Sequence, residues 1–451
     1  MSAPLYDALR ALSQKKTIRF HMPGHKGQPV LPDFSPILPL DFTEIYETGN
    51  LYTGEGPIRL AEEQAAHFYH AADCHFLTGG SSQGIHAMLY AAAGCGSSIL
   101  FDRNCHKSCA HAAAMLDLTP TFVFPSILEP YGVPALLDPS AIHAALKQHP
   151  QIKTVLVTSP NYYGICQDIP AIADICHAHG AKLLVDAAHG AHFPAVGLKS
   201  PIQLGADLAV LSAHKTLYAM GQAAMILSNG TIDCAKLREG AALFGTSSPS
   251  YAILASLDLA RNALEQDDSY QKTAQAVDKL KSHLSQTHFL PLSSEVPLDP
   301  CRLTISTAGT NLSGDTLSDL LYTRFGIACE MSDLRNIVCI VTPADLPQNL
   351  ALLEQALLEL SREVQPTAQP APLTPLPHPH PILSVRTAML GPCYDLPLSD
   401  VHSGMVCARP VTPYPPGVPV LWPGEEITKQ HIVFLTNQCY NTVSRILLYM
   451  Q

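Results

Sequence analysis

Apolar runs alternate with amphipathic stretches between about residues 56 and 230. Four short apolar runs are predicted to be buried strands, at residues 97–101, 154–157, 182–185 and 208–211. A helical pattern at 58–72 precedes them, with Leu60, Ala65, Ala66 and Phe68 among the candidates for burial. Other helical patterns lie between them, such as 169–179, which Gly180 would close. This alternation predicts an α/β fold with a mainly parallel sheet covered on both faces.

The second half of the chain has a different pattern. Residues 251–288 are helical in pattern, with a break near Asp267-Asp268. Strands are predicted at 301–306, 326–330 and 337–342, and a closing helix at 346–363. Residues 365–381 are rich in proline and are predicted to form an extended linker, and the remaining residues would form a small C-terminal module.

Composition narrows the class of protein. The chain has 451 residues, of which 47% are hydrophobic and 14% charged, as in globular proteins of two or three domains. The net charge is −11 without a long basic run, so a nucleic-acid-binding surface is not indicated. No stretch approaches the roughly 18 to 20 apolar residues that cross a bilayer. The 13 cysteines follow no repeated spacing and the first residues have no signal pattern, so we expect free thiols and a cytoplasmic location.

Two residues at the ends of apolar runs indicate the chemistry. Asp186 ends the run Lys182-Leu-Leu-Val-Asp, and Lys215 lies in Ser212-Ala-His-Lys, directly after another run. A lysine amine can form a Schiff base with pyridoxal 5′-phosphate, and a carboxylate can keep the pyridine nitrogen of that cofactor protonated. Ligands bind at the carboxyl ends of parallel strands, which favours this interpretation over a helix cap or a surface charge.

The segment Thr78-Gly-Gly-Ser-Ser-Gln-Gly84 precedes a helical pattern. Small residues let backbone amides approach an anion, and a helix N-terminus adds a favourable dipole. A phosphate would fit there, although such a loop is more often a turn with a helix cap. Ser212 and His214 could donate further hydrogen bonds to a phosphate.

His106 follows the predicted strand 97–101 and could stack on a flat cofactor ring. With 21 histidines in the chain, a structural or surface role is the common alternative. Cysteines and histidines also gather at 105–111 and 176–179, but neither group has the spacing of a strong zinc motif, so we expect no metal.

Several motifs taken together resemble the fold-type-I pyridoxal-phosphate decarboxylases of ornithine, lysine and arginine, in the short bacterial form without the N-terminal receiver-like domain. The matching stretches run nearly from end to end: Phe20-His-Met-Pro-Gly-His-Lys26, Gly56-Pro-Ile58 with Ala61-Glu62, Gly79 to Gly84, Asp102 to Ser108, Asp186 to His192, Ser212 to Thr216, Thr246 to Tyr251, and Pro413 to Glu425.

The resemblance implies roles for individual residues. Lys215 would carry the cofactor, Asp186 would face its pyridine nitrogen, and His106 would stack on its ring. The other implied cofactor contacts are Ser81, Ser82, Gln83, His189, Ser212, His214, Ser247 and Ser248. For the substrate side chain the resemblance offers two acidic candidates, Glu330 and Glu425, and does not choose between them.

The resemblance also implies an aspartate-aminotransferase-like large domain, a small α/β domain and a C-terminal module. The boundaries that we predict are 1–50 for an N-terminal segment, 51–290 for the large domain, 291–364 for the small domain, 365–382 for the linker and 383–451 for the module. Thr246-Ser-Ser-Pro249 resembles a segment that reaches the neighbouring subunit's phosphate, which implies a homodimer with shared active sites, able to assemble further.

The expected activity is α-decarboxylation of arginine, lysine or ornithine to agmatine or a diamine, in polyamine synthesis. The rivals are another enzyme of the same cofactor class, either an aminotransferase or a β-eliminating lyase, and a catalytically dead regulatory relative. The C-terminal module favours the decarboxylases, and the intact Lys215 and Asp186 argue against a dead relative. Many members of the family have Asp-Asp-Leu where this chain has Gly49-Asn-Leu51, and larger ones have an aromatic residue at His189, so the substrate stays open.

Overall fold

The computed structural model describes residues 2–15, 17–293, 296–345, 347–367, 373, 376–413, 417–438 and 443–450. Part of the predicted linker and Tyr414, Pro415 and Pro416 of the C-terminal motif lie outside these residues. The chain divides into two compact units: residues 1–92, 169–177 and 182–271 form the first, and residues 93–168, 178–181 and 272–451 form the second. Within the described residues no helix is long and apolar enough to cross a membrane.

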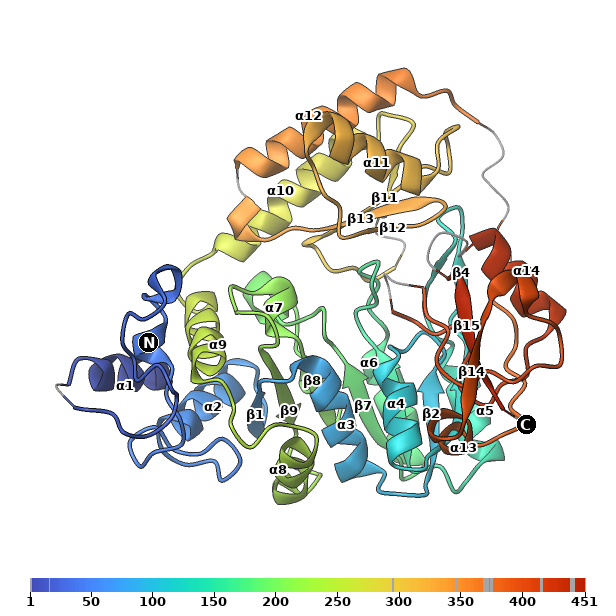
Figure 1. The fold of residues 1–451 in the computed structure, drawn as a ribbon. Coiled ribbons are helices and arrows are strands. Elements are labelled where there is room, and N and C mark those ends of the chain that lie inside the picture. The colour runs from blue at the N-terminus through green and yellow to red at the C-terminus, as the bar shows by residue number, and fades with distance from the viewer. Residues whose placement is uncertain are drawn as a thin grey trace. The chain divides into compact units, whose positions relative to one another are not determined.

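A seven-stranded sheet has the order β1-β9-β8-β7-β6-β2-β3 (Figure 1). Its strands are β1 (Asp73–Leu77), β2 (Ser98–Asp102), β3 (Thr119–Val123), β6 (Thr154–Thr158), β7 (Lys182–Asp186), β8 (Leu208–Leu211) and β9 (Ala224–Ser228). Strands β2 and β3, β2 and β6, and β7 and β8 pair in parallel, whereas β9 is antiparallel to both β1 and β8. The four predicted strands and the mainly parallel sheet are confirmed, and the structure adds β1, β3 and β9.

The first unit contains the helices that flank the strands nearest the predicted site. They are α1 (Pro4–Ser13), α2 (Gly56–Phe68), α3 (Gly80–Ala92), α6 (Ile169–Ala178), α7 (Ala213–Thr216), α8 (Cys234–Leu243) and α9 (Tyr251–Leu264). Gly180 is left-handed, with φ +64°, and follows α6 as predicted. The predicted burial of Leu60 in α2 is wrong, since this residue is 52% exposed. The predicted burial of Ala65 and Ala66 is confirmed.

The second unit contains a four-stranded antiparallel sheet in the order β10-β11-β13-β12. These strands are β10 (Leu290–Pro291), β11 (Arg302–Ser306), β12 (Met331–Ser332) and β13 (Asn336–Ile340). Helices α10 (Ser269–Leu284), α11 (Gly314–Phe325) and α12 (Gln348–Glu363) bury apolar side chains such as Leu280, Leu321 and Leu357 in the same core. The predicted break between the long helices is confirmed, since α9 ends at Leu264 and α10 begins at Ser269.

The predicted strand 326–330 is wrong. Helix α11 runs to Phe325 and ends on Gly326 in the left-handed conformation, at φ +69°. The chain first pairs with β13 at Met331, opposite Val338. The β-branched and apolar residues after Gly326 resemble a strand in sequence, but the helix end that glycine allows delays the pairing.

Further elements of the second unit are α4 (Ser108–Met115), α5 (Pro139–Gln148), α13 (Val385–Leu390) and α14 (Lys429–Gln438). Two antiparallel strand pairs join them, β4 (Ile127–Leu128) with β5 (Val133–Pro134), and β14 (Cys393–Pro397) with β15 (Arg445–Tyr449). The C-terminal residues have a core of their own, which includes Val401, Leu421, Ile427 and Leu448.

Candidate active site

Asp186 is the last residue of β7 and lies opposite Val210 of β8. Its carboxyl group is buried, and its Oδ1 accepts a hydrogen bond of 3.1 Å from the amide of Ala188. Burial raises the pKa of Asp186 above its ordinary value, while the Lys215 charge and the Ala188 amide lower it. The charge of Asp186 is therefore costly in this position and favours a cationic partner at the carboxyl end of the sheet.

Lys215 lies in α7, one short helical turn after β8. Its side chain is half-buried, and its Nζ is 3.1 Å from Nε2 of His189, in the loop that follows β7. The adjacent parallel strands thus bring Asp186, His189 and Lys215 into one site. The motifs named all three residues, but no spacing rule could predict the contact between His189 and Lys215.

Ser212 and His214 shape the turn that carries Lys215. Ser212 is buried, and its Oγ is 3.3 Å from Nδ1 of His214. The same ring nitrogen is 3.1 Å from the carbonyl oxygen of Ala223. These contacts tie the turn that carries Lys215 to the segment at Ala223.

Helix α3 begins at Gly80, so Ser81 to Gly84 of the predicted Gly-Ser loop belong to its first turns and do not precede the helix. Gly80 has a left-handed backbone conformation, with φ +70°. Its amide donates a hydrogen bond of 2.9 Å to the carbonyl oxygen of Gln222. Gln222 precedes Ala223, which contacts His214, so the loop at 220–223 joins the start of α3 to the turn of Lys215. Gln222 itself adopts φ +76°, a conformation that a glutamine sequence does not predict.

Ser81 and Ser82 form the first turn of α3 and are half-buried, where helix amides point outward. Gln83 is instead bonded within the protein at both ends of its amide. Its Oε1 accepts a hydrogen bond of 2.8 Å from the amide of Gly79, and its Nε2 donates a hydrogen bond of 2.7 Å to the carbonyl oxygen of Ala241. Gln83 therefore supports the loop, and its predicted contact with the cofactor stays a prediction.

The backbone packs closely against neighbouring atoms at two glycines near the predicted site, Gly84 and Gly245. A Cβ at Gly84 would lie 2.5 Å from Cγ2 of Val210, so glycine lets α3 pack against β8. A Cβ at Gly245 would lie 2.2 Å from the Tyr52 hydroxyl and 2.4 Å from Nε2 of Gln83. Beyond Gly245, Ser247 and Ser248 are exposed in the segment between α8 and α9.

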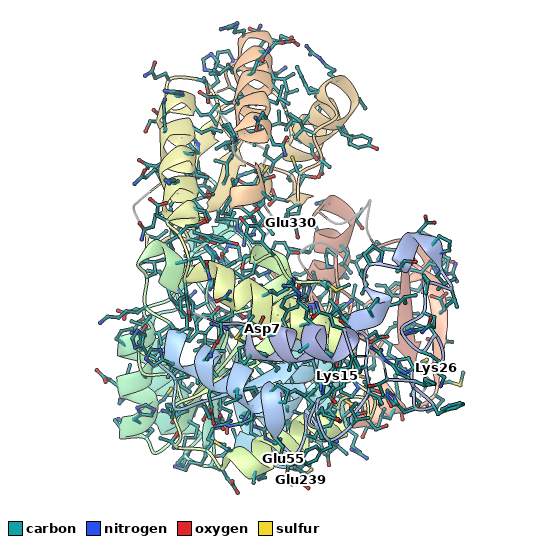
Figure 2. The ribbon with its side chains drawn as sticks, turned by 90° about the vertical axis from the view of Figure 1, so that its left-hand side faces the viewer. Asp7, Lys15, Lys26, Glu55, Glu239 and Glu330 are labelled. Atoms are coloured by element: carbon teal, nitrogen blue, oxygen red, sulfur yellow. The ribbon has the colours of Figure 1, made fainter. Side chains whose placement is uncertain are left out.

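His106, Glu330 and Glu425 belong to the second unit. The Nδ1 of His106 is 2.8 Å from the Ser108 hydroxyl, at the start of α4. Glu330 is exposed (Figure 2). Its Oε1 accepts a 2.8 Å hydrogen bond from the Tyr162 hydroxyl.

Glu425 is held inside the C-terminal part of the second unit. It is 1% exposed. Its Oε2 is 3.5 Å from Nη2 of Arg103 and accepts a hydrogen bond of 3.0 Å from the amide of Trp422. Burial raises the pKa of Glu425, and Arg103 opposes that change. The carboxylate thus has a cationic partner in its own unit, one that the sequence analysis did not identify.

Comparison with known proteins identifies the family. Residues 3–289 match the major domain of the Orn/Lys/Arg decarboxylases, and residues 375–440 match the C-terminal domain of the same family. The chain belongs to the Orn/Lys/Arg decarboxylase family. It is a pyridoxal-phosphate-dependent decarboxylase of basic amino acids.

Individual relatives agree with this assignment. The chain is 31% identical to an arginine decarboxylase of Bacillus subtilis, over 96% of this chain and 92% of the relative. It is 25% identical to the inducible lysine decarboxylase of Escherichia coli, over 95% of this chain and 75% of the relative. Among solved structures, a lysine decarboxylase of Francisella novicida matches with a TM-score of 0.83 at 19% identity, over 99% of this chain and 81% of that one, which shows a shared fold.

Membership of the family implies pyridoxal 5′-phosphate as cofactor, and the residues of the site fit it. A buried carboxylate, a half-buried lysine and a helix N-terminus lined by serines occur together at the carboxyl end of β7 and β8. They supply the three kinds of contact that the cofactor needs: an amine, an acid for the ring nitrogen and amides for the phosphate.

Proposed function

We propose that the chain decarboxylates L-arginine to agmatine and carbon dioxide. The observation that supports arginine is the pattern among relatives. Arginine decarboxylases of Bacillus subtilis and Halalkalibacterium halodurans are each 31% identical over 96% of this chain, whereas the lysine decarboxylase of Pseudomonas aeruginosa is 28% identical over 58%.

In this proposal Lys215 is the point of attachment for the cofactor and Asp186 holds its ring nitrogen protonated. When bound, pyridoxal phosphate supplies a conjugated ring that accepts the electrons of the bond between Cα and the carboxylate. The contact of His189 with Lys215 orients the amine, and a neutral imidazole there would accept a proton from it. His106 is proposed to stack on the ring, by resemblance to the family.

The phosphate is proposed to bind at the first turn of α3, where Ser81 and Ser82 offer amides and hydroxyls. Ser212 and His214 complete this site from the turn before Lys215. Gln222 links the two segments through its contact with Gly80, so a phosphate there would contact groups already held in place.

For the substrate's guanidinium we propose Glu330 rather than Glu425. Glu330 is exposed and bonded to the Tyr162 hydroxyl, so its charge can receive a cation without breaking an ion pair. Glu425 already faces Arg103 in a buried environment, where losing the pair would leave one charge uncompensated.

A homodimer with shared sites is also proposed. Large apolar side chains are exposed in the N-terminal segment, among them Phe20 at 93%, Val30 at 61% and Phe34 at 60%. Such a surface is typical of a protein interface, and two-fold dimers are the commonest oligomers. Ser247 and Ser248 are exposed as well, which suits a segment that reaches the phosphate of a second copy.

Product analysis tests the substrate. Purified enzyme with pyridoxal phosphate is given arginine, lysine and ornithine separately, and released carbon dioxide and amine are measured. We expect agmatine from arginine at a kcat/KM at least tenfold above the other two. A preference for lysine or ornithine would reject arginine as the substrate, and no carbon dioxide from any of the three would reject the decarboxylase function.

A second arm tests the acidic receiver. Glu330→Gln should raise the KM for arginine with little change in the visible absorption of the bound cofactor. Glu425→Gln serves as the matched control, because its carboxylate pairs with Arg103. It should lower the unfolding temperature and leave the KM for arginine nearly unchanged. The reverse result would transfer the role to Glu425.

A further inference from the structure

Three side chains with metal-binding atoms meet at the start of β1. Asp73 and His75 alternate on this strand and therefore lie on the same face of it, and Cys234 is the first residue of α8. One ligand atom from each lies within 4.8 Å of the other two. All three belong to the first unit, and none lies in the cysteine- and histidine-containing segments 105–111 and 176–179.

His75 has a buried ring without hydrogen bonds. It is 2% exposed, and among the described residues neither of its ring nitrogens has a hydrogen-bond partner. Its Nε2 is 3.5 Å from Oδ2 of Asp73, which is longer than a normal hydrogen bond. Burying polar nitrogens without partners is costly, and a ligated metal ion would satisfy one of them.

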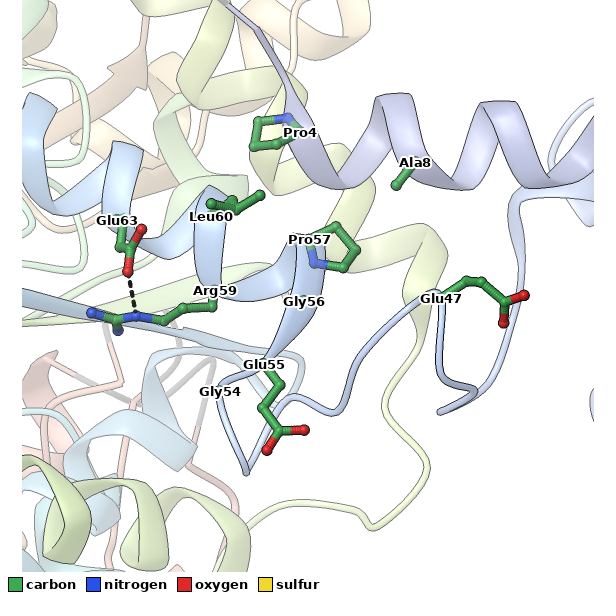
Figure 3. A pocket seen from close by; sticks show the side chains of 10 residues that line it. All are labelled: Pro4, Ala8, Glu47, Gly54, Glu55, Gly56, Pro57, Arg59, Leu60 and Glu63. Atoms are coloured by element: carbon green, nitrogen blue, oxygen red, sulfur yellow. Dashed lines mark hydrogen bonds and ion pairs between the residues drawn. The ribbon is translucent and has the colours of Figure 1, made fainter.

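Asp73 is oriented by its other oxygen. Its Oδ1 accepts two hydrogen bonds, one of 2.7 Å from Nη1 of Arg59 and one of 2.8 Å from the amide of Cys74, while Oδ2 faces His75. Arg59 is itself fixed, because its Nε donates 2.9 Å to Glu63 (Figure 3). Carboxylates that bind metals are commonly held by hydrogen bonds of this kind, which direct the ligating oxygen.

The protonation states suit a metal ligand. Burial lowers the pKa of His75 to about 4, the charges of Arg238 and Arg59 lower it as well, and Asp73 opposes them. The imidazole is thus neutral near pH 7, as coordination requires. Burial and the neighbouring Asp73 raise the pKa of the Cys234 thiol, and a bound cation would reverse this effect by stabilising the thiolate.

The cluster lies at the opposite end of the strands from the candidate active site. Asp73 and Leu208 both pair with Ser228 of β9, so Asp73 is level with the first residue of β8. Lys215 follows the last residue of that strand, and Asp186 ends β7. A metal here would join β1 to α8 without contacting the reacting groups.

We propose that Asp73, His75 and Cys234 bind a Zn²⁺ ion, with water as the fourth ligand. Imidazole nitrogen, thiolate and carboxylate together are a donor set that zinc prefers. Bonds of about 2.0–2.3 Å place tetrahedral ligand atoms roughly 3.3–3.7 Å apart, so side-chain shifts of about 1 Å would complete the site. Cys234 is partly exposed, which gives the ion a route in from solvent.

Equilibrium dialysis of the chelator-treated holoenzyme against Zn²⁺ tests the site. We expect one equivalent per chain, with the affinity at least tenfold weaker in Cys234→Ser and in His75→Gln. Cys95→Ser and His67→Gln are matched controls at exposed positions and should bind as the wild type does. The absence of stoichiometric zinc in the wild type, or equal binding in Cys234→Ser, would overturn the proposal.

Thermal unfolding provides a second readout. Zn²⁺ should raise the unfolding temperature of the wild type and of Cys95→Ser but not that of Cys234→Ser, because an ion that binds only the folded chain stabilises it. The decarboxylation rate should stay within twofold in all three, since the cluster is remote from Lys215. If His75→Gln fails to fold, the pair of cysteine variants still decides, because Cys234 is only partly buried. Stabilisation of Cys234→Ser to the same extent would reject the assignment.

Discussion

The Nζ of Lys215 lies 3.1 Å from Nε2 of His189, so the proposed cofactor lysine is held by a residue from the neighbouring strand's loop. A single hydrogen bond of this kind contributes about 1 kcal/mol. His189→Gln should therefore lower kcat by roughly tenfold or less and still allow borohydride to trap the cofactor on Lys215. Steady-state kinetics and peptide mapping check this, with His67→Gln as the control. A label on another lysine would contradict the assignment of Lys215 itself.

Asp186→Asn should lower the decarboxylation rate far more than the cofactor content. Losing a buried charge opposite a cation costs on the order of 3–5 kcal/mol. Because this loss would act mainly on the transition state, the rate should fall by roughly 10² to 10³. Asp207→Asn is the matched control, since Asp207 is a buried acid just before β8, at the other end of the strands. A rate for Asp186→Asn within a few-fold of wild type would remove Asp186 from the mechanism.

Asp207 should affect stability in a pH-dependent way. Burial alone would raise its pKa, but hydrogen bonds from Thr231, the Leu183 amide and His177, with the charge of Lys182, lower the pKa overall. The ionised carboxylate therefore stabilises the fold above its unfolded pKa of about 3.9, and this contribution is lost as the pH falls through the lower folded value.

Denaturant unfolding from pH 7 to pH 3 measures this effect. Asp207→Asn should be less stable than wild type by about 2–3 kcal/mol at pH 7. The difference should shrink below about pH 4, where the wild type also becomes protonated. A difference that grows in acid would have the wrong sign for a lowered pKa.

Gly245→Ala should destabilise the Gly-Ser loop, because the new Cβ would collide with the Tyr52 hydroxyl and with Nε2 of Gln83. Overpacking of this kind costs about 1–3 kcal/mol, and disturbing Gln83 should also weaken cofactor binding. Gly221→Ala is the control, since a Cβ there meets nothing within 4 Å. Thermal unfolding and cofactor titration compare the two, and equal behaviour would show that the loop tolerates the change.

Shared active sites predict recovery in mixed dimers. Lys215→Ala and the double variant Ser247→Ala, Ser248→Ala should each be inactive, whereas verified mixed dimers should regain about a quarter to a half of the wild-type activity per dimer, because one site combines intact parts from both chains. Activity assays after co-expression with two different tags measure this. An active monomer in solution, or no recovery, would refute sharing.

The sequence by itself determined the strands at 97–101, 154–157, 182–185 and 208–211 and the family, and it predicts Asp186 and Lys215 as the central pair. Burial on both faces of a parallel sheet needs continuous apolar runs, and the motifs that end those runs carry the chemistry. Asp186 and Lys215 could therefore be named from local pattern alone.

Only the tertiary structure decided which side chains meet. It places His189 against Lys215, gives Gln83 a supporting role, pairs Glu425 with Arg103 and gathers Asp73, His75 and Cys234. These contacts join segments far apart in the chain, and their distances depend on strand order and helix packing, which periodicity does not encode. The misplaced strand at 326–330 has the same origin, because a left-handed glycine after α11, and not the apolar residues that follow it, set where pairing began.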